Sequence, residues 1–181
     1  MINVIDPFPQ YILTDQLTID NGSIKKFCLE TYSKFPTTFR SNKGGYQSPY
    51  FTFNVIEEHG CLKELFKKIN EDIKIFHNKN ELYNGLILDS FWVNVNKKGD
   101  VHVPHIHFGN IVSGTYYVDV TEDSGDLVFF NCLFQYKNEF SIQPKNNLLT
   151  IFPSHFSHYV KPNKTNKKRI SISFNYAMKY E

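Results

Sequence analysis

Hydrophobic residues recur at helical spacing in two stretches of the first 84 residues. Capping residues open the stretch Asp20–Lys34, which carries one apolar face, and a longer apolar stripe with lysines on its opposite side follows in Cys61–His77. Both stretches are predicted to be helices. Glycines and a proline lie between them in 41–51, which is predicted to be a loop. The apolar face of the first helix comprises Ile24, Phe27, Cys28 and Tyr32.

The pattern changes near residue 85, where short apolar runs alternate with turn residues. Such runs are typical of β-strands. About eight of them after a helical part predict a mainly β fold with N-terminal helices, a double-stranded β-helix (jelly roll, cupin-like) with helices packed on one sheet. We expect a single domain over 1–181, with 1–84 as a helical support region and 85–178 as the jelly-roll core. The predicted strands are Leu86–Val95, Val101–Phe108, Ile111–Val120, Asp126–Cys132, Phe140–Gln143, Leu148–Phe152, Phe156–Val160 and Ile170–Tyr176.

Composition agrees with this prediction and narrows the class of protein. The chain has 17 Phe and 11 Tyr, which favour strands and argue against a disordered chain. A formal charge of +2 gives no general case for binding nucleic acid. The first residues lack a signal-peptide pattern, and no run approaches the ~20 apolar residues that span a membrane. The three cysteines are widely spaced and odd in number, so we expect reduced thiols in a cytosolic protein; they are Cys28, Cys61 and Cys132.

Two histidines stand one residue apart in the second predicted strand. Because residues i and i+2 of a strand point to the same face, His105 and His107 would present two imidazoles side by side, a simple way to supply two metal ligands. His102 precedes His105 by three residues and is expected on the opposite strand face. The third ligand must then come from elsewhere in the fold.

A second set of polar residues lies near the C-terminus. His158 and Arg169 flank a polar turn, so they would lie on two successive antiparallel strands. Arg169, Ser171 and Ser173 alternate with apolar residues, which predicts one polar and one apolar strand face. An arginine inside a barrel is unfavourable unless it meets an anion. Its planar fork suits a carboxylate, and the hydroxyl of Ser171 can bind the same group.

Taken in order, these motifs resemble a known family, the jelly-roll oxygenases that depend on iron(II) and 2-oxoglutarate (2OG). More narrowly, they are similar to the 2OG-Fe(II) oxygenases of bacteria and their phages. The similarity covers about residues 85–176 and, more weakly, the GGYQSP loop. The matching segments are W-x-N-V-N from Trp92, H-x-H from His105, SGTYYV from Ser113, GDLVFF from Gly125, LLTIFPSHFSHYV from Leu148 and RISISFN from Arg169.

The resemblance implies a role for each matching residue. It implies iron ligation by His105, His107 and His158, and binding of the distal carboxylate of 2OG by Arg169 with help from Ser171. Other residues implied to contact the cosubstrate or line the pocket are Asn94, Tyr117, Trp92, Asn96, Tyr116 and Asn175. Strand alternation leaves open which of the two tyrosines faces inward.

His107 stands where most of the superfamily has a carboxylate. Asp100, Asp119 and Asp126 are alternative third ligands, and we prefer His107 because the i, i+2 position shares a face with His105. Three neutral ligands carry one negative charge fewer than two histidines and a carboxylate, which should loosen iron binding. His155 is expected to pack at the rim.

The implied activity is an Fe(II)- and 2OG-dependent dioxygenase that hydroxylates an unidentified substrate and releases succinate and CO2. The substrate would be a small molecule or a protein side chain, without nucleic acid or membrane as partner. Two alternatives remain: a three-histidine, cupin-type metal enzyme that does not use 2OG, and a non-catalytic jelly-roll module. We expect a cytoplasmic protein of a bacterium or phage-infected cell, and a homodimer as the common assembly of soluble enzymes.

Overall fold

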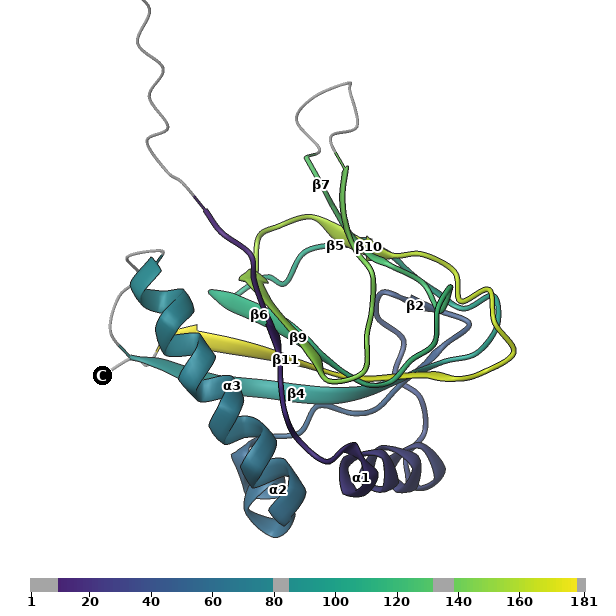
Figure 1. Cartoon of the computed structure of the whole chain (residues 1–181), viewed down its shortest axis with the longest axis horizontal. Coiled ribbons are helices and arrows are strands. Elements are labelled where there is room, and N and C mark those ends of the chain that lie inside the picture. Colours follow the sequence, from purple (N-terminus) through teal and green to yellow (C-terminus); the bar gives the residue numbers. More distant parts are fainter. Residues whose placement is uncertain (1–9, 80–84, 132–138, 179–181) are drawn as a thin grey trace, which may run out of the picture.

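Two antiparallel sheets face each other in the computed structural model, which describes residues 10–79, 85–131 and 139–178 (Figure 1). A six-stranded major sheet has the order β1-β9-β6-β11-β4-β3, and a five-stranded minor sheet has the order β2-β5-β10-β7-β8. This is the predicted jelly roll. The strands are β1 Leu13–Gln16, β2 Asn42–Lys43, β3 Tyr46–Gln47, β4 Leu86–Asn96, β5 Val101–His105, β6 Val112–Asp119, β7 Leu127–Phe130, β8 Glu139–Ile142, β9 Leu148–Pro153, β10 His158–Val160 and β11 Arg169–Met178.

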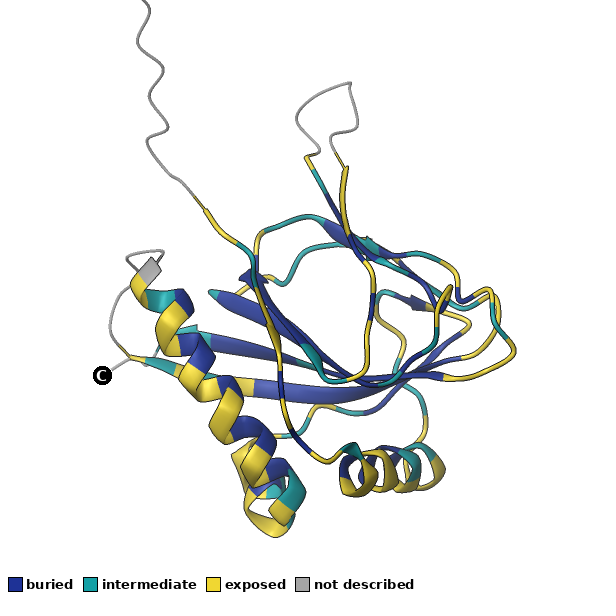
Figure 2. Cartoon of the chain, in the orientation of Figure 1, coloured by how far each residue is buried: buried dark blue, intermediate teal, exposed yellow. Residues whose placement is uncertain are grey.

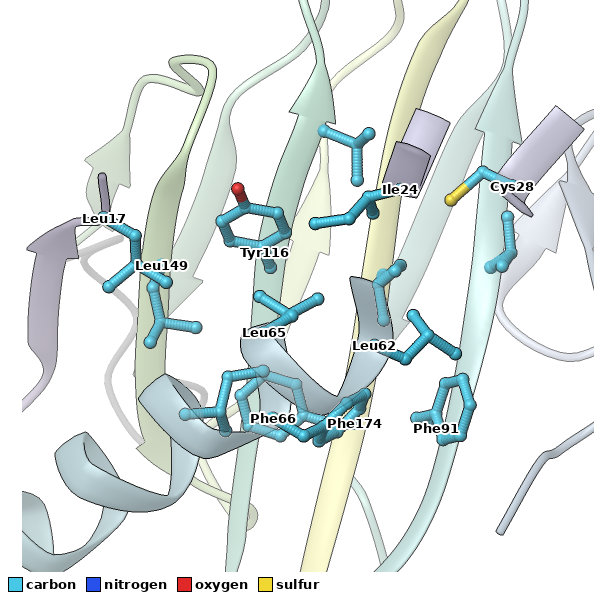
Figure 3. Packing of buried hydrophobic residues seen from close by; sticks show 14 of the residues in the cluster. Leu17, Ile24, Cys28, Leu62, Leu65, Phe66, Phe91, Tyr116, Leu149 and Phe174 are labelled. Carbon is cyan, nitrogen blue, oxygen red and sulfur yellow. The ribbon is translucent and has the colours of Figure 1, made fainter. Parts of the chain in front are cut away.

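Three helices, α1 Asn21–Lys34, α2 Phe53–Glu58 and α3 Gly60–Lys79, lie on the outer face of the major sheet (Figures 1 and 2). The two predicted helices are therefore confirmed. Asp20 caps α1, because its carboxylate accepts a hydrogen bond of 3.0 Å from the Gly22 N–H. Figure 3 shows side chains of α1 and α3 packed on those of β4, β6 and β11. The residues labelled there are Leu17, Ile24, Cys28, Leu62, Leu65, Phe66, Phe91, Tyr116, Leu149 and Phe174.

Alternation along β4 and β11 gives the major sheet one apolar and one polar face. Ile170, Ile172 and Phe174 join the core beneath the helices, whereas Arg169 and Ser171 are buried on the opposite face, toward the minor sheet. The predicted separation of polar and apolar residues on this strand is confirmed. The polar face is what the major sheet contributes to the interior of the roll.

The region before residue 85 contains more than helices. β2 and β3 lie within 41–51, which was predicted as a loop, and β1 pairs with β9. Strands of two to four residues are too short to show an alternating pattern. Cys132, predicted as a reduced thiol, lies outside the described residues, and Cys28 and Cys61 are free thiols. No helix of the described part is long and apolar enough to cross a membrane.

Candidate metal and cosubstrate site

Three histidines of the minor sheet converge on one point of the interior. His105 is the last residue of β5 and His158 the first of β10, and the two are directly paired in the ladder. One ligand atom from each of His105, His107 and His158 can be chosen so that all three lie within 4.8 Å of one another. Ring centroids are 4.2 Å apart for His105 and His158, and 5.1 Å apart for His107 and His158. We call this group the three-histidine cluster.

His107 reaches the cluster by a different route from the one predicted. β5 ends at His105, so His107 lies two residues beyond the strand, and the prediction that strand alternation aligns the two rings is wrong. Its N–H donates to the carbonyl of Ser154 at 2.9 Å, which ties this segment to the chain after β9. A backbone contact with a neighbouring segment, rather than the pleat, therefore positions His107.

Each ring of the cluster is oriented through its Nδ1 atom. Nδ1 of His105 lies 2.8 Å from the carbonyl of Val103, and Nδ1 of His158 lies 2.8 Å from that of Phe156. Nδ1 of His107 lies 2.7 Å from the side-chain oxygen of Asn175. An oxygen of a carbonyl group can only accept, so in each case Nδ1 carries the proton and Nε2 keeps its lone pair. This is the tautomer that metal-binding histidines need.

The environment of the cluster also favours neutral rings. Burial lowers the pKa of His105, and burial together with the nearby His105 lowers the pKa of His107 to about 4. Burial and then the neighbouring histidines lower the pKa of His158 well below its ordinary value. Neutral imidazole is the form that ligates metal, so the cluster is deprotonated at neutral pH before any ion arrives.

The carboxylates considered as alternative ligands lie outside the cluster. Asp119 forms an ion pair of 2.7 Å with Lys25, and Asp126 one of 3.0 Å with Lys161. Asp100 accepts a hydrogen bond of 2.6 Å from the Lys97 N–H. Within residues 10–79, 85–131 and 139–178, the three histidines form the only group of metal-ligating side chains that comes together in this way.

Arg169 is buried on the polar face of the major sheet. It is 3% exposed and pairs with Asn96 of the neighbouring strand β4. Its guanidinium lies 5.3 Å from the centroid of the Tyr117 ring. No carboxylate of the described residues forms an ion pair with it. Burial raises the pKa of Tyr117, and the Arg169 guanidinium opposes that rise. A buried cation without a carboxylate partner is unfavourable, and its presence points to an anionic ligand.

Several buried polar atoms around Arg169 also lack partners. Both side-chain amide atoms of Asn96, the Oδ1 atom of Asn94 and the hydroxyl of Tyr117 have no hydrogen bond within the described part of the chain, and neither has the Nε atom of Arg169. Because buried polar groups are normally satisfied, this concentration indicates where a polar ligand binds. Ser171 lies in register with Asn94 on one side and with Tyr117 on the other.

An open pocket of about 620 Å³ reaches His105 and His107 from the surface. Trp92 forms part of its wall, with its ring stacked on that of His107 at 5.7 Å between centroids. Asn175 also lines the pocket, whereas Arg169 and Asn94 do not. Metal ligands therefore stand between an accessible space and the buried surroundings of Arg169.

The comparisons with known proteins agree with this arrangement. The sequence model of a family described as "Putative 2OG-Fe(II) oxygenase" matches residues 90–133 and 131–175, the stretch that contains the three-histidine cluster and Arg169. The chain belongs to the 2OG-Fe(II) oxygenase superfamily. Iron(II) and 2OG are accordingly the cofactor and cosubstrate of this oxygenase. Among curated proteins, none matches its sequence.

Solved structures share the fold of the oxygenase at low sequence identity. A prolyl-4-hydroxylase from Pseudomonas putida superposes with a TM-score of 0.67 at 14% identity, over 93% of each chain. A prolyl hydroxylase from Trichoplax adhaerens gives 0.69 at 17% identity, over 95% of this chain and 84% of that one. The epimerase SnoN from nogalamycin biosynthesis gives 0.73 at 11% identity, over 93% and 78%.

The residues present in the oxygenase fit both groups. Three converging Nε2 lone pairs suit a divalent iron, because imidazole is a common iron ligand. Arg169, with the unpaired donors of Asn96 and Tyr117 near it, suits a carboxylate.

Two predicted positions are wrong. Tyr116 packs in the helix-covered core of the oxygenase and donates a hydrogen bond of 2.6 Å to the Asn21 side-chain oxygen, so it does not line the pocket; its neighbour Tyr117 faces inward instead. His102, predicted on the strand face opposite His105, lies on the same face. His102 and His105 pair with Val160 and His158, which are two residues apart on β10, so β5 contains an extra residue. Such a β-bulge resets the alternation.

No pattern in the sequence indicates the hydrogen-bond network behind His107. The side-chain oxygen of Asn175, which holds the His107 ring, also accepts a hydrogen bond of 2.8 Å from Ser113. Ser113 in turn lies 2.7 Å from the Ser154 hydroxyl. Asn175 belongs to β11, Ser113 to β6 and Ser154 to the turn after β9. Among these three, the family motif had indicated only Asn175 as a pocket residue. His155, predicted to pack at the rim, is exposed and contacts Gln10 through Nε2 at 2.8 Å.

Proposed function

We propose that the protein is a 2OG-dependent hydroxylase in which the three-histidine cluster holds Fe(II) and Arg169 holds the distal carboxylate of 2OG. The observation that carries the proposal is the convergence of three imidazoles whose Nδ1 atoms are all hydrogen-bonded, which leaves each Nε2 lone pair free for a metal ion. The convergence of three neutral imidazoles does not stabilise the histidines themselves, whereas a metal ion needs several ligands directed at one position.

The other residues have positioning roles in this proposal. Asn175 fixes the plane of the His107 ring, and Trp92 covers one face of it. Asn94, Ser171 and Tyr117 surround the carbon chain and distal carboxylate of 2OG. When bound, Fe(II) and 2OG supply the oxidation by O2 that this superfamily performs, with succinate and CO2 as products. The burial of Arg169 strengthens its attraction for the carboxylate.

The substrate enters through the 620 Å³ pocket in this proposal. Its rim is apolar in part, since the side chains of Phe108 and Val103 are 87% and 41% exposed. Arg40 and Asp89 add one charge of each sign to the lining. Such a surface suits an organic molecule or a protein side chain of mixed polarity. Two of the similar structures are prolyl hydroxylases, one of them in complex with a peptide fragment, which supports the inclusion of peptides among the candidates.

Succinate formation from 2OG by the full chain, loaded with Fe(II) and exposed to O2, tests the proposal. We expect His105→Ala and His158→Ala to abolish both succinate formation and retention of iron. His155→Ala is the matched control, because that histidine is exposed and lies outside the cluster. Succinate production at the wild-type rate by both cluster variants would contradict the assignment.

A second arm separates the two alternatives. A three-histidine enzyme that does not use 2OG predicts metal binding without 2OG binding, and a non-catalytic jelly roll predicts no stoichiometric iron in protein purified without oxygen. Calorimetric 2OG binding that depends on the metal and is lost in Arg169→Ala would exclude both. The absence of metal-dependent 2OG binding by the wild-type protein would favour the first alternative.

A further inference from the structure

His102 is a buried histidine for which neither the metal cluster nor the family motifs provide a role. It is 8% exposed and sits on the interior face of β5, three residues before His105. The bulge in β5 that turns it inward contains Pro104, a residue tolerated within sheets mainly at bulges and edges. On the outer face the polar ring would stay in contact with water, whereas burial of the ring is unfavourable. Its inward position therefore requires an explanation.

His102 has only one hydrogen-bond partner within the described residues. Its Nδ1 atom lies 3.2 Å from the hydroxyl of Ser41, and its Nε2 atom has none. Burial, followed by the Arg169 guanidinium and then by His105 and His107, lowers the pKa of His102 to about 3. The ring is therefore neutral. Asn42, which pairs with His102, donates a hydrogen bond to the Gly45 carbonyl, and Gly45 lies against the side chain of Asn96. Asn96 is the partner of Arg169 in the ladder, so His102 and Arg169 lie at the same end of the roll.

Three of the unpaired atoms near Arg169 are donors, and they call for an acceptor; they are Asn96 Nδ2, the Tyr117 hydroxyl and Arg169 Nε. An anion at this point would accept hydrogen bonds only. The Ser41 hydroxyl can rotate to donate to Nδ1, which leaves the proton of the neutral ring on Nε2, directed at the anion. His102 can thus bind a carboxylate without adding a second buried positive charge beside Arg169.

Resting on the proposed function, we infer that His102 is a second anchor for the distal carboxylate of 2OG and makes the site selective for 2-oxo acids that carry that carboxylate. Arg169 contributes the charge, and His102 contributes a directed donor from the opposite sheet. The carboxylate is then held between the minor and the major sheet. Ser41 is a positioning residue for this carboxylate, since its hydroxyl contacts the His102 ring.

The test combines two ligands with three variants of the full-length, Mn(II)-loaded protein. 2-Oxoglutarate and 2-oxovalerate have the same five-carbon chain and the same 2-oxo acid group, but only 2OG has the distal carboxylate. We expect His102→Leu to weaken 2OG binding about tenfold, the effect of one charge-assisted hydrogen bond, and to change 2-oxovalerate binding less than twofold. His102→Gln, which restores a donor, should recover most of the loss, and Ser41→Ala should show a smaller loss confined to 2OG.

Calorimetry separates the outcomes of this test. Equal weakening of both ligands by His102→Leu would mean that His102 only supports the fold, and unchanged 2OG binding would mean that it makes no contact; either result overturns the inference. If His102→Leu does not fold, the comparison of the two ligands in His102→Gln and Ser41→Ala decides, and the inference fails if Ser41→Ala leaves 2OG binding unchanged. A wild-type protein that binds no 2OG in the presence of metal refutes the proposed function itself.

Discussion

Replacement of Arg169 by methionine separates a ligand-binding role from a structural one. The Arg169 side chain is buried without a carboxylate partner in the described residues, and its only favourable contact of note is with the Tyr117 ring. A cation–π contact of this kind contributes about 1–2 kcal/mol, and relief of the buried charge returns a similar amount. The melting temperature of the ligand-free protein should therefore change by only a few degrees.

The variant should differ from wild type when ligand is added. At 2OG concentrations of about 100 times Kd, binding stabilises the metal-loaded wild-type protein by about 2.7 kcal/mol, or roughly 5–11 °C for a chain of this size. Loss of a buried charge pair costs about 3 kcal/mol, which raises Kd about a hundredfold. At the same 2OG concentration Arg169→Met would then gain only about 0.4 kcal/mol, or about 1–2 °C.

Thermal melts of the Mn(II)-loaded protein with and without 2OG measure both effects. Lys26→Met is the control, because it also replaces a cation by methionine but at an exposed position of α1, outside the pocket. It should keep the full shift. A wild-type shift in Arg169→Met would refute the reasoning, and so would a loss of more than about 10 °C by the ligand-free variant, since Arg169 would then be structural.

Four further predictions concern the cluster and the sheet behind it. Asn175→Ala should weaken metal binding about 10–100-fold in a dialysis assay, because the His107 ring loses its acceptor. Metal affinity should fall less than about tenfold between pH 7.5 and 5.5, where three ordinary histidines would lose about a thousandfold, because burial lowers the pKa of the cluster. The same lowered pKa values mean that the unfolded chain binds more protons, so the stability of the metal-free protein should fall as pH drops below about 6.5. Gly114→Ala should destabilise the protein by about 1–3 kcal/mol or more in urea unfolding, since the added methyl group would meet the Phe174 ring and lie 2.7 Å from the Thr150 carbonyl.

Most of the fold follows from periodicity, because its long elements are amphipathic. The ten residues of β11 alternate, β4 alternates from Phe91 to Asn96 beyond a register shift near Asp89, and α3 carries one continuous apolar stripe. The short strands β2 and β3 have no such pattern. They form because the main chain of 41–51 runs beside β5 and β4, which is a property of the tertiary structure.

The candidate site was predictable to the extent that its residues lie on regular strands. Arg169 and Ser171 face the interior as β11 alternation requires, and the order of the family motifs supplied His158. The choice between Tyr116 and Tyr117 was open because both neighbours on β6 are aromatic, and only the helices over one face decide it. The hydrogen bond that orients His107 joins residues 68 positions apart, a separation at which sequence patterns carry no information.

Both errors on β5 have the same physical origin, which is also a property of the site. A regular strand from 101 to 108 would place His105 and His107 inward and His102 outward. The bulge and the early end of β5 instead bring all three toward the interior, two through the ladder and one through a contact with the turn after β9. Irregular backbone thus lets one short segment supply two candidate ligands for iron and, in our inference, one for 2OG. A regularly paired strand could not direct His102 to the same face as His105 and His107, because only every second residue of such a strand points to one face.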